Sequence, residues 1–255
     1  MQKFIIFLFF ILSLNVNATS SDFPNSLVKN SFVKTGIYEA WYDGATSRYD
    51  HGVLGDEIEA SILRLKIKSK DGIYSTSLTL DKSLVFEDLK PRLEDINNDG
   101  NLEIIVIQSH QNLGARVVVY KLNHAKKLEE FVSTPFIGKR YRWLAISAIA
   151  DINKDGFMDI VYVDRPHLAN ILRVWTYKNN DFYELASIRG LSNHRIGNNF
   201  ISGGIKNCKG EIEIITANGD WSHIMSTMFI EKKLQSVKVA PYNNEDGFNT
   251  ILSCK

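Results

Sequence analysis

Short apolar runs separated by polar turns dominate the chain, and their spacing is that of β-strands. The run ILRLKI at residues 62–67 alternates apolar and basic residues, as a strand with one buried face does. Other runs are rich in β-branched and aromatic residues; they are IIVI at 104–107, VVVY at 117–120, IVYV at 160–163, ILRVWTY at 171–177 and IEIITA at 212–217. Beyond the N-terminal apolar run we find no helical periodicity, so the pattern predicts an all-β protein.

One segment of the chain is repeated. Residues 93–106, LEDINNDGNLEIIV, recur as residues 149–162, IADINKDGFMDIVY. A weaker third copy, IKNCKGEIEII, follows at residues 205–215. Each copy leads into a further strand, a polar turn and another strand. Four strands in about 50 residues is the content of one propeller blade, so the repeat predicts a β-propeller of four-stranded blades.

The two strong copies both fit the pattern D-x-N-x-D-G-x-x-[DE], which suits a calcium ion. Calcium takes about six to eight oxygen ligands in a flexible shell, and glycine at position 6 allows the sharp turn that wraps a loop around it. The side chains at positions 1, 3, 5 and 9 and the backbone carbonyl at position 7 are the candidate ligands. The first set is Asp95, Asn97, Asp99, Asn101 and Glu103, and the second is Asp151, Asn153, Asp155, Phe157 and Asp159.

Two alternatives compete with a calcium loop of this kind. An EF-hand needs glutamate at position 12, where this chain has Val106 and Tyr162, and strands rather than a helix follow both loops. An Asx-rich β-turn without metal is the other alternative. The repetition of an acidic residue at position 9 favours calcium. In the third copy, positions 1 and 5 are Ile205 and Lys209, neither of which can bind the ion.

The loop pattern resembles the repeat signature of the FG-GAP/VCBS families, which form β-propellers in integrin α-subunit heads and in many bacterial exported proteins. The separate FG and GAP signatures of these families are absent. The stretches RYDHGVLGD (48–56), VFEDLKPRL (85–93) and RPH (165–167) are also similar to those of uncharacterised bacterial exported FG-GAP-like proteins. The resemblance implies a propeller fold, but it does not imply a ligand or a number of blades.

Repeats of this length predict five blades, with four as the alternative. Four would occupy residues 48–90, 91–140, 141–193 and 194–240. The C-terminal segment TILSC would then be a strand of a composite fifth blade, paired with strands near Val33–Tyr42. Such pairing of N- and C-terminal strands would close the ring and protect its edges.

The calcium loops follow first strands, so they should lie on the face opposite the turns that carry most of the histidines. This second face would suit an anionic, sugar or metal ligand; the alternative is that turns are polar without binding anything. Its candidate residues are His51, Arg92, His110, Arg142, Trp143, Asp164, His167, His194 and His223.

The two cysteines, Cys208 and Cys254, allow a disulfide that clasps the C-terminus. Because Cys208 lies in the degenerate third loop, the bond would replace the ion there as a local staple. Two free, buried thiols are the alternative.

The first residues of the chain have the features of a secretory signal. Lys3 precedes an apolar run at 4–14 that is shorter than the about 20 residues needed to cross a bilayer, and Val16 and Ala18 form a cleavage site. We therefore expect a signal peptide at 1–18 and one propeller domain at 19–255, exported to the periplasm or secreted, without a transmembrane segment.

The net charge of +1 argues against a nucleic-acid partner. We expect a monomer that acts as a non-catalytic binding or scaffold protein of the cell envelope, with structural calcium at two sites. Its partner would be a protein, a glycan or a small molecule. The alternatives are a hydrolase or lyase that acts on glycans or phosphoesters through the histidine-bearing face, and a carbohydrate-binding module that uses Trp143 or Trp221. No G-x-S-x-G, H-E-x-x-H or P-loop motif supports an enzyme.

Overall fold

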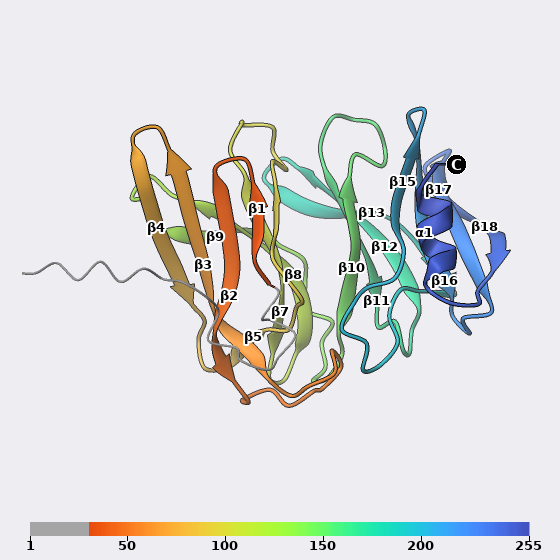
Figure 1. Cartoon of the computed structure of the whole chain (residues 1–255), viewed down its shortest axis with the longest axis horizontal. Coiled ribbons are helices and arrows are strands. Elements are labelled where there is room, and N and C mark those ends of the chain that lie inside the picture. The colour runs from red at the N-terminus through yellow and green to blue at the C-terminus, as the bar shows by residue number, and fades with distance from the viewer. Residues whose placement is uncertain (1–30, 255) are drawn as a thin grey trace, which may run out of the picture.

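The computed structural model describes residues 31–254, and this part of the chain consists of antiparallel β-sheets and one short helix (Figure 1). The predicted signal peptide at 1–18 lies outside the described residues. Within them, no helix is long and apolar enough to cross a membrane. The prediction of an all-β protein is confirmed.

The first two blades share one hydrogen-bonded sheet, joined by the single pair Ala60 and Phe86. The first blade contains β1 (Val33–Thr35), β2 (Tyr38–Thr46), β3 (Glu59–Ser69) and β4 (Gly72–Thr79). The second contains β5 (Leu84–Phe86), β6 (Arg92–Glu94), β7 (Glu103–His110), β8 (Gly114–Leu122) and β9 (Leu128–Ser133). Both β5 and β6 pair with β7, at its opposite ends, so residues 87–91 interrupt the first strand of this blade.

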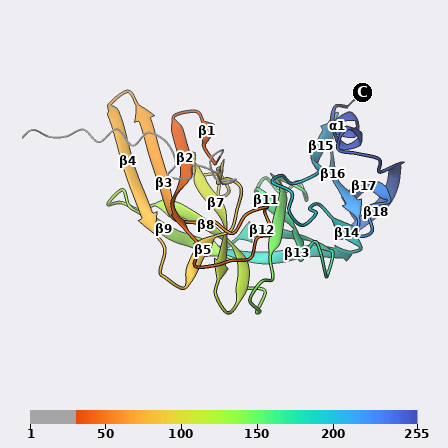
Figure 2. The ribbon, with the colours of Figure 1, turned by 60° about the horizontal axis from the view of Figure 1, so that its bottom comes forward.

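The third and fourth blades are separate sheets. The third contains β10 (Leu144–Ala150), β11 (Asp159–Asp164), β12 (Ile171–Lys178) and β13 (Asp181–Arg189). The fourth contains β14 (Leu191–Ser192), β15 (Gly204–Cys208), β16 (Glu211–Asn218), β17 (His223–Ile230) and β18 (Lys233–Pro241), and α1 (Asp246–Leu252) follows it. The views of Figures 1 and 2 show the blades following one another in an arc from β4 to β18.

Both faces of each inner sheet are buried, which explains the continuous apolar runs in the sequence. In β7, Ile104 and Val106 pack with the first blade, while Ile105 and Ile107 pack with the third. In β11, Val161 and Val163 face the fourth blade in the same way. Burying a side chain of this size contributes about 1.5–3 kcal/mol, so the blade interfaces are the main source of stability.

Residues 31–254 form four blades, the alternative to the five expected, and within these residues no pairing of N- and C-terminal strands closes the ring. The segment TILSC is not a strand, because Thr250–Leu252 belong to α1, and β1 pairs only with β2. The apolar residues Phe248, Ile251 and Leu252 are three and four positions apart, the spacing of one helix face. They cover the side of the fourth blade that carries Ile215, Ala217 and Ile224, where a further blade would otherwise pack.

The loop between β2 and β3, residues 47–58, connects the first blade to the third and fourth; we call it the strap. Val53 and Leu54 of the strap are buried in the core between the second and third blades. The Val53 carbonyl accepts a hydrogen bond of 3.0 Å from the Gly197 amide in the fourth blade. Gly55 has a positive φ of 105°, and a Cβ there would lie 3.0 Å from the Gly197 carbonyl oxygen, so glycine allows this approach.

Candidate calcium loops and the cluster beneath the strap

The loop of residues 95–103, between β6 and β7, is organised by its own acidic side chains. Asp95 accepts hydrogen bonds from the amides of Asp99 (3.1 Å) and Gly100 (2.9 Å). Asn97 Oδ1 also accepts from the Asp99 amide, at 2.9 Å, and Ile96 donates to Glu103 Oε2 at 3.1 Å. The oxygens at positions 1, 3 and 9 are thus held in place by the backbone of the loop itself.

The loop of residues 151–159, between β10 and β11, repeats these contacts. Asp151 accepts from the amides of Asp155 (3.0 Å) and Gly156 (2.9 Å), and Asn153 Oδ1 accepts from Asp155 at 2.9 Å. The Ile152 amide donates to Asp159 Oδ2 at 2.9 Å. The two copies therefore share a backbone as well as a sequence pattern, although no three Asp, Glu, His or Cys side chains between residues 31 and 254 converge as a ready metal cluster.

The position-9 carboxylates of these two loops are buried, and among the described residues neither makes an ion pair, although Lys121 on the neighbouring strand lowers the pKa of Glu103 slightly. Glu103 is 1 % exposed and Asp159 is fully buried. Burial raises the pKa of Glu103 to about 7 and that of Asp159 to about 6. The Oδ1 oxygen of Asp159 is buried with no hydrogen-bond partner. Burying a carboxylate that makes no ion pair is costly. Both sites therefore fit a cation, which would bring positive charge to Glu103 and to the unpartnered Oδ1 oxygen of Asp159.

The fourth blade provides an internal comparison, because its position-9 residue has a cation of its own. Glu213 accepts a 2.7 Å hydrogen bond from Lys206 Nζ, and this contact lowers the pKa of the Glu213 carboxyl. The calcium loop itself is replaced by a two-residue turn of Lys209 and Gly210, both at positive φ, between β15 and β16. Where the loop is lost, an ammonium group takes the place next to the carboxylate.

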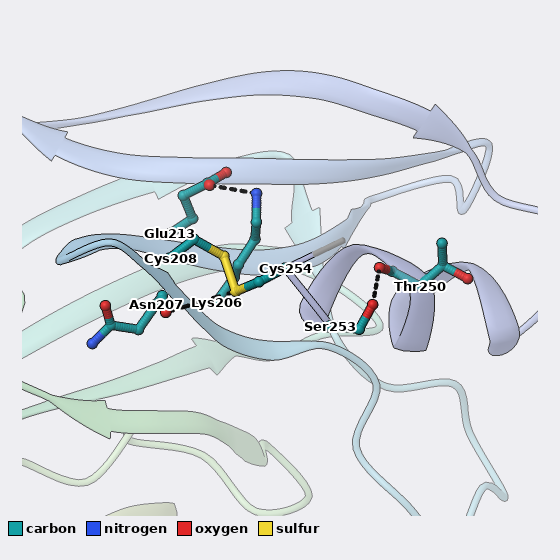
Figure 3. The surroundings of a disulfide bond; sticks show 7 residues. All are labelled: Lys206, Asn207, Cys208, Glu213, Thr250, Ser253 and Cys254. Atoms are coloured by element: carbon teal, nitrogen blue, oxygen red, sulfur yellow. Dashed lines mark hydrogen bonds and ion pairs between the residues drawn. A yellow bond between two sulfur atoms is a disulfide. The ribbon is translucent and has the colours of Figure 1, made fainter.

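Figure 3 shows a disulfide between Cys208, at the end of β15, and Cys254, just beyond α1. The bond joins the helix to the edge of the fourth blade, close to the Lys206–Glu213 pair. The shortened third copy is therefore held by an ion pair and a covalent bond within the chain.

On the opposite side of the blades, several of the predicted ligand-face residues meet in a buried cluster beneath the strap. His51 Nδ1 lies 2.5 Å from Glu87 Oε1, and the His51 ring stacks on Tyr141 with centroids 5.0 Å apart. Trp143 Nε1 donates to the Glu87 carbonyl at 2.8 Å, and its ring meets His194 edge-on at 5.0 Å. Glu87, Trp143 and His194 are all nearly or fully buried.

The cluster includes a direct pair of histidines. His194 Nε2 lies 2.8 Å from the Asn198 carbonyl, which can only accept, so this nitrogen carries the proton. His194 Nδ1 must then accept from His167 Nε2, 3.0 Å away. Burial lowers the pKa of His167 to about 4 and also lowers the pKa of His194. Both rings are therefore neutral near pH 7.

The remaining predicted ligand-face residues do not join this cluster. Arg92 pairs with the buried Asp88 at 2.7 Å, and Asp164 pairs with Arg165 and Arg173. Arg142 donates to the Tyr141 carbonyl, His110 meets Phe136 edge-on, and His223 contacts Ser222. The structure thus brings together His51, Trp143, His167 and His194 and keeps the other five residues apart.

The contacts within the cluster are those of a structural network. Ser109 donates its hydroxyl proton to Glu87, not to His51, so the histidine is not positioned to activate this serine. Glu87 and Glu59 are buried carboxylates that the sequence analysis did not assign, and burial raises the pKa of both. Glu87 lies in the VFEDLKPRL stretch, the one sequence feature that pointed toward it.

The repeated segment that contains the two loops matches a known protein family. The family model of the FG-GAP-like repeat matches residues 95–162, which contain both loops, all of β10 and most of β11. Residues 95–162 therefore form an FG-GAP-like repeat. The resemblance predicted from the loop pattern is thereby confirmed, and FG-GAP-like repeats imply a propeller arrangement of the four blades. A comparison with curated proteins found no match to this chain.

Proposed function

We propose that this FG-GAP-like protein is an exported binding or scaffold protein of the cell envelope, without catalytic activity, and that two structural calcium ions stabilise its second and third blades. The observation that supports calcium most directly is the contrast between blades. Glu213 makes an ion pair with Lys206, whereas the equivalent Glu103 and Asp159 are buried and make no ion pair within residues 31–254. A divalent ion in each loop would supply that charge, and Asn101 and Phe157 would contribute their carbonyl oxygens at position 7.

The binding role is supported by the FG-GAP-like match and by the arrangement of the chain in β-sheet blades joined by loops. FG-GAP-like repeats build propeller blades whose loops present residues to partners, and the cluster beneath the strap is internally satisfied. Calcium would stabilise the folded protein rather than take part in catalysis. Ions that bind only the native loops add their binding free energy to the stability of the folded state.

Calorimetric titration of the exported, EDTA-stripped protein with CaCl2 tests the calcium proposal. We expect two bound ions per chain and a melting temperature that rises by several degrees at 1 mM CaCl2. MgCl2 should give a smaller rise, since Mg²⁺ demands a tighter octahedral shell. The Asp95→Asn plus Asp151→Asn double variant should lose both effects. Titration without heat, together with equal melting temperatures in EDTA and CaCl2, would refute the proposal.

Export is tested separately by N-terminal sequencing of the protein recovered outside the cytoplasm. We expect the mature chain to begin at Thr19, after cleavage behind Ala18. Recovery of the intact chain in the cytoplasm alone would contradict the envelope role without bearing on calcium.

A further inference from the structure

The two candidate calcium loops, although they belong to different blades, are in direct contact. The side-chain amide of Asn98 in the first loop donates a 2.5 Å hydrogen bond to the Gly156 carbonyl in the second. Asn98 has a positive φ of 59°, a conformation that asparagine tolerates better than most residues. The contact therefore depends on the exact backbone path of the first loop at position 4.

The same peptide unit of the second loop is held from both of its sides. Its carbonyl oxygen, on Gly156, accepts from Asn98, and its amide, on Phe157, donates to Asp155 Oδ1 at 3.0 Å. Asp155 is the position-5 candidate ligand, and Phe157 supplies the candidate carbonyl at position 7. In the first loop, Asn98 itself lies between the candidate ligands Asn97 and Asp99. One hydrogen bond thus links residues that adjoin candidate ligands in both loops.

We propose that calcium binding at the two loops is positively coupled through the Asn98–Gly156 hydrogen bond, an inference that rests on the proposed calcium function. An ion in the first loop fixes Asn97 and Asp99 and thereby the backbone and side chain of Asn98. The fixed amide holds the Gly156–Phe157 peptide in the position that the second loop needs to bind its own ion. The second ion then costs less conformational entropy, and by linkage the effect is equal in both directions.

The chain contains a matched control position for this contact. Lys154 occupies position 4 of the second loop and also has a positive φ, of 60°. Within the described residues it makes no hydrogen bond to another loop of this kind. Glycine tolerates a positive φ, so Asn98→Gly removes the bridging amide and Lys154→Gly repeats the backbone change without removing a bridge.

The test is a thermodynamic cycle of calcium titrations by calorimetry. In the wild-type background, Asp151→Asn should abolish the second site and weaken the first roughly fivefold, the effect of about one hydrogen bond. In the Asn98→Gly background, Asp151→Asn should leave the affinity of the first site unchanged. The Lys154→Gly background should behave like the wild type. Asp155→Asn serves as a second way to disable the same loop, and circular dichroism verifies that each variant is folded.

The outcomes separate the coupling from the calcium function. Two sites that bind independently in the wild type, or a fivefold effect that persists in Asn98→Gly, would overturn the coupling and leave calcium binding intact. Absence of calcium binding in the wild type would overturn both. Coupling that disappears in Asn98→Gly and remains in Lys154→Gly would establish the proposal.

Discussion

Replacing Glu103 by glutamine should have opposite effects on stability with and without calcium. Glutamine has nearly the same shape and keeps an oxygen that can accept from the Ile96 amide, but it carries no charge. In the absence of metal, the variant removes a buried carboxylate that makes no ion pair in the described part of the chain and whose charge Lys121 offsets only in part. In the presence of calcium, it removes one ligand of the first loop.

The magnitude follows from the pKa of this group. Burial raises the pKa of Glu103 from 4.5 to about 7. At about 1.4 kcal/mol per pKa unit, this difference corresponds to roughly 3 kcal/mol at most. Because the loop around the carboxylate is solvent-exposed, screening reduces the expected effect to about 1–2 kcal/mol. A wild-type site with calcium at about 100 times its Kd would gain about 2.7 kcal/mol, which the variant should lose.

The sign of the pH dependence is also defined. Since the folded-state pKa of Glu103 is raised from 4.5 to about 7, the wild-type side chain is mostly neutral in both states below pH 4, and it destabilises the metal-free fold progressively as pH rises from 4.5 to about 7. In EDTA, Glu103→Gln and wild type should therefore melt alike at pH 4, and the variant should melt about 2–6 °C higher at pH 8. In CaCl2 at pH 8, the order should reverse.

Thermal melts followed by circular dichroism in EDTA and in CaCl2 measure both effects. Glu213→Gln is the control, because Glu213 already has Lys206 as its cation. This control should lower stability by about 0.5 kcal/mol in both buffers and leave the calcium response unchanged. The reasoning would be refuted by a Glu103→Gln protein that is less stable than the wild type in EDTA. It would also be refuted if calcium raised the stability of this variant as much as that of the wild type.

Three further predictions concern the parts of the fold that hold the blades together. Burial lowers the folded-state pKa of His167 to about 4, whereas the unfolded chain protonates this side chain below pH 6.5, so its stabilising contribution is lost as pH falls from 6.5 toward 4. Between pH 7 and pH 5, the free energy of unfolding of His167→Gln, measured by urea titration, should therefore fall by about 1–2 kcal/mol less than that of the wild type. Equal falls in the two proteins would contradict this. Cys254→Ser opens a loop with a sequence separation of 46 residues and should cost about 2–4 kcal/mol, with faster hydrogen exchange in α1 but an unaltered calcium titration; unchanged exchange in the helix would be inconsistent with a staple. Leu54→Ala removes a strap side chain that is 3 % exposed and should cost about 2–4 kcal/mol and deprotect residues 47–58 in hydrogen exchange, whereas a loss below 1 kcal/mol would mean that the strap does not contribute to the core.

The two candidate calcium loops could be recognised as a repeated motif because all of their information is local. Ligand types, their spacing and the turn glycine lie within nine consecutive residues, and the same physical constraints act on both copies. The ion pair of Lys206 and Glu213 could also have been found by aligning the third copy, since the two residues take positions 2 and 9 of the degenerate repeat. The bridge from Asn98 to Gly156 could not, because it joins blades whose relative placement no local pattern specifies.

The strap and the C-terminal helix were missed for a related reason: each is defined by what it covers. Val53 and Leu54 form a two-residue apolar pair in a polar loop, and only the arc of blades creates the interior that buries them. The helix α1 spans a few residues, too short for a periodic signal, and its apolar face matters only because the fourth blade ends with one side open. A fifth blade would have used the same apolar surface, so a strand and a helix were equally compatible with TILSC as a sequence. The disulfide joins Cys254, just beyond α1, to Cys208 at the blade edge, and so holds the helix at that open side. The cysteine pair, rather than the apolar pattern, was thus the sequence feature that carried information about how the array ends.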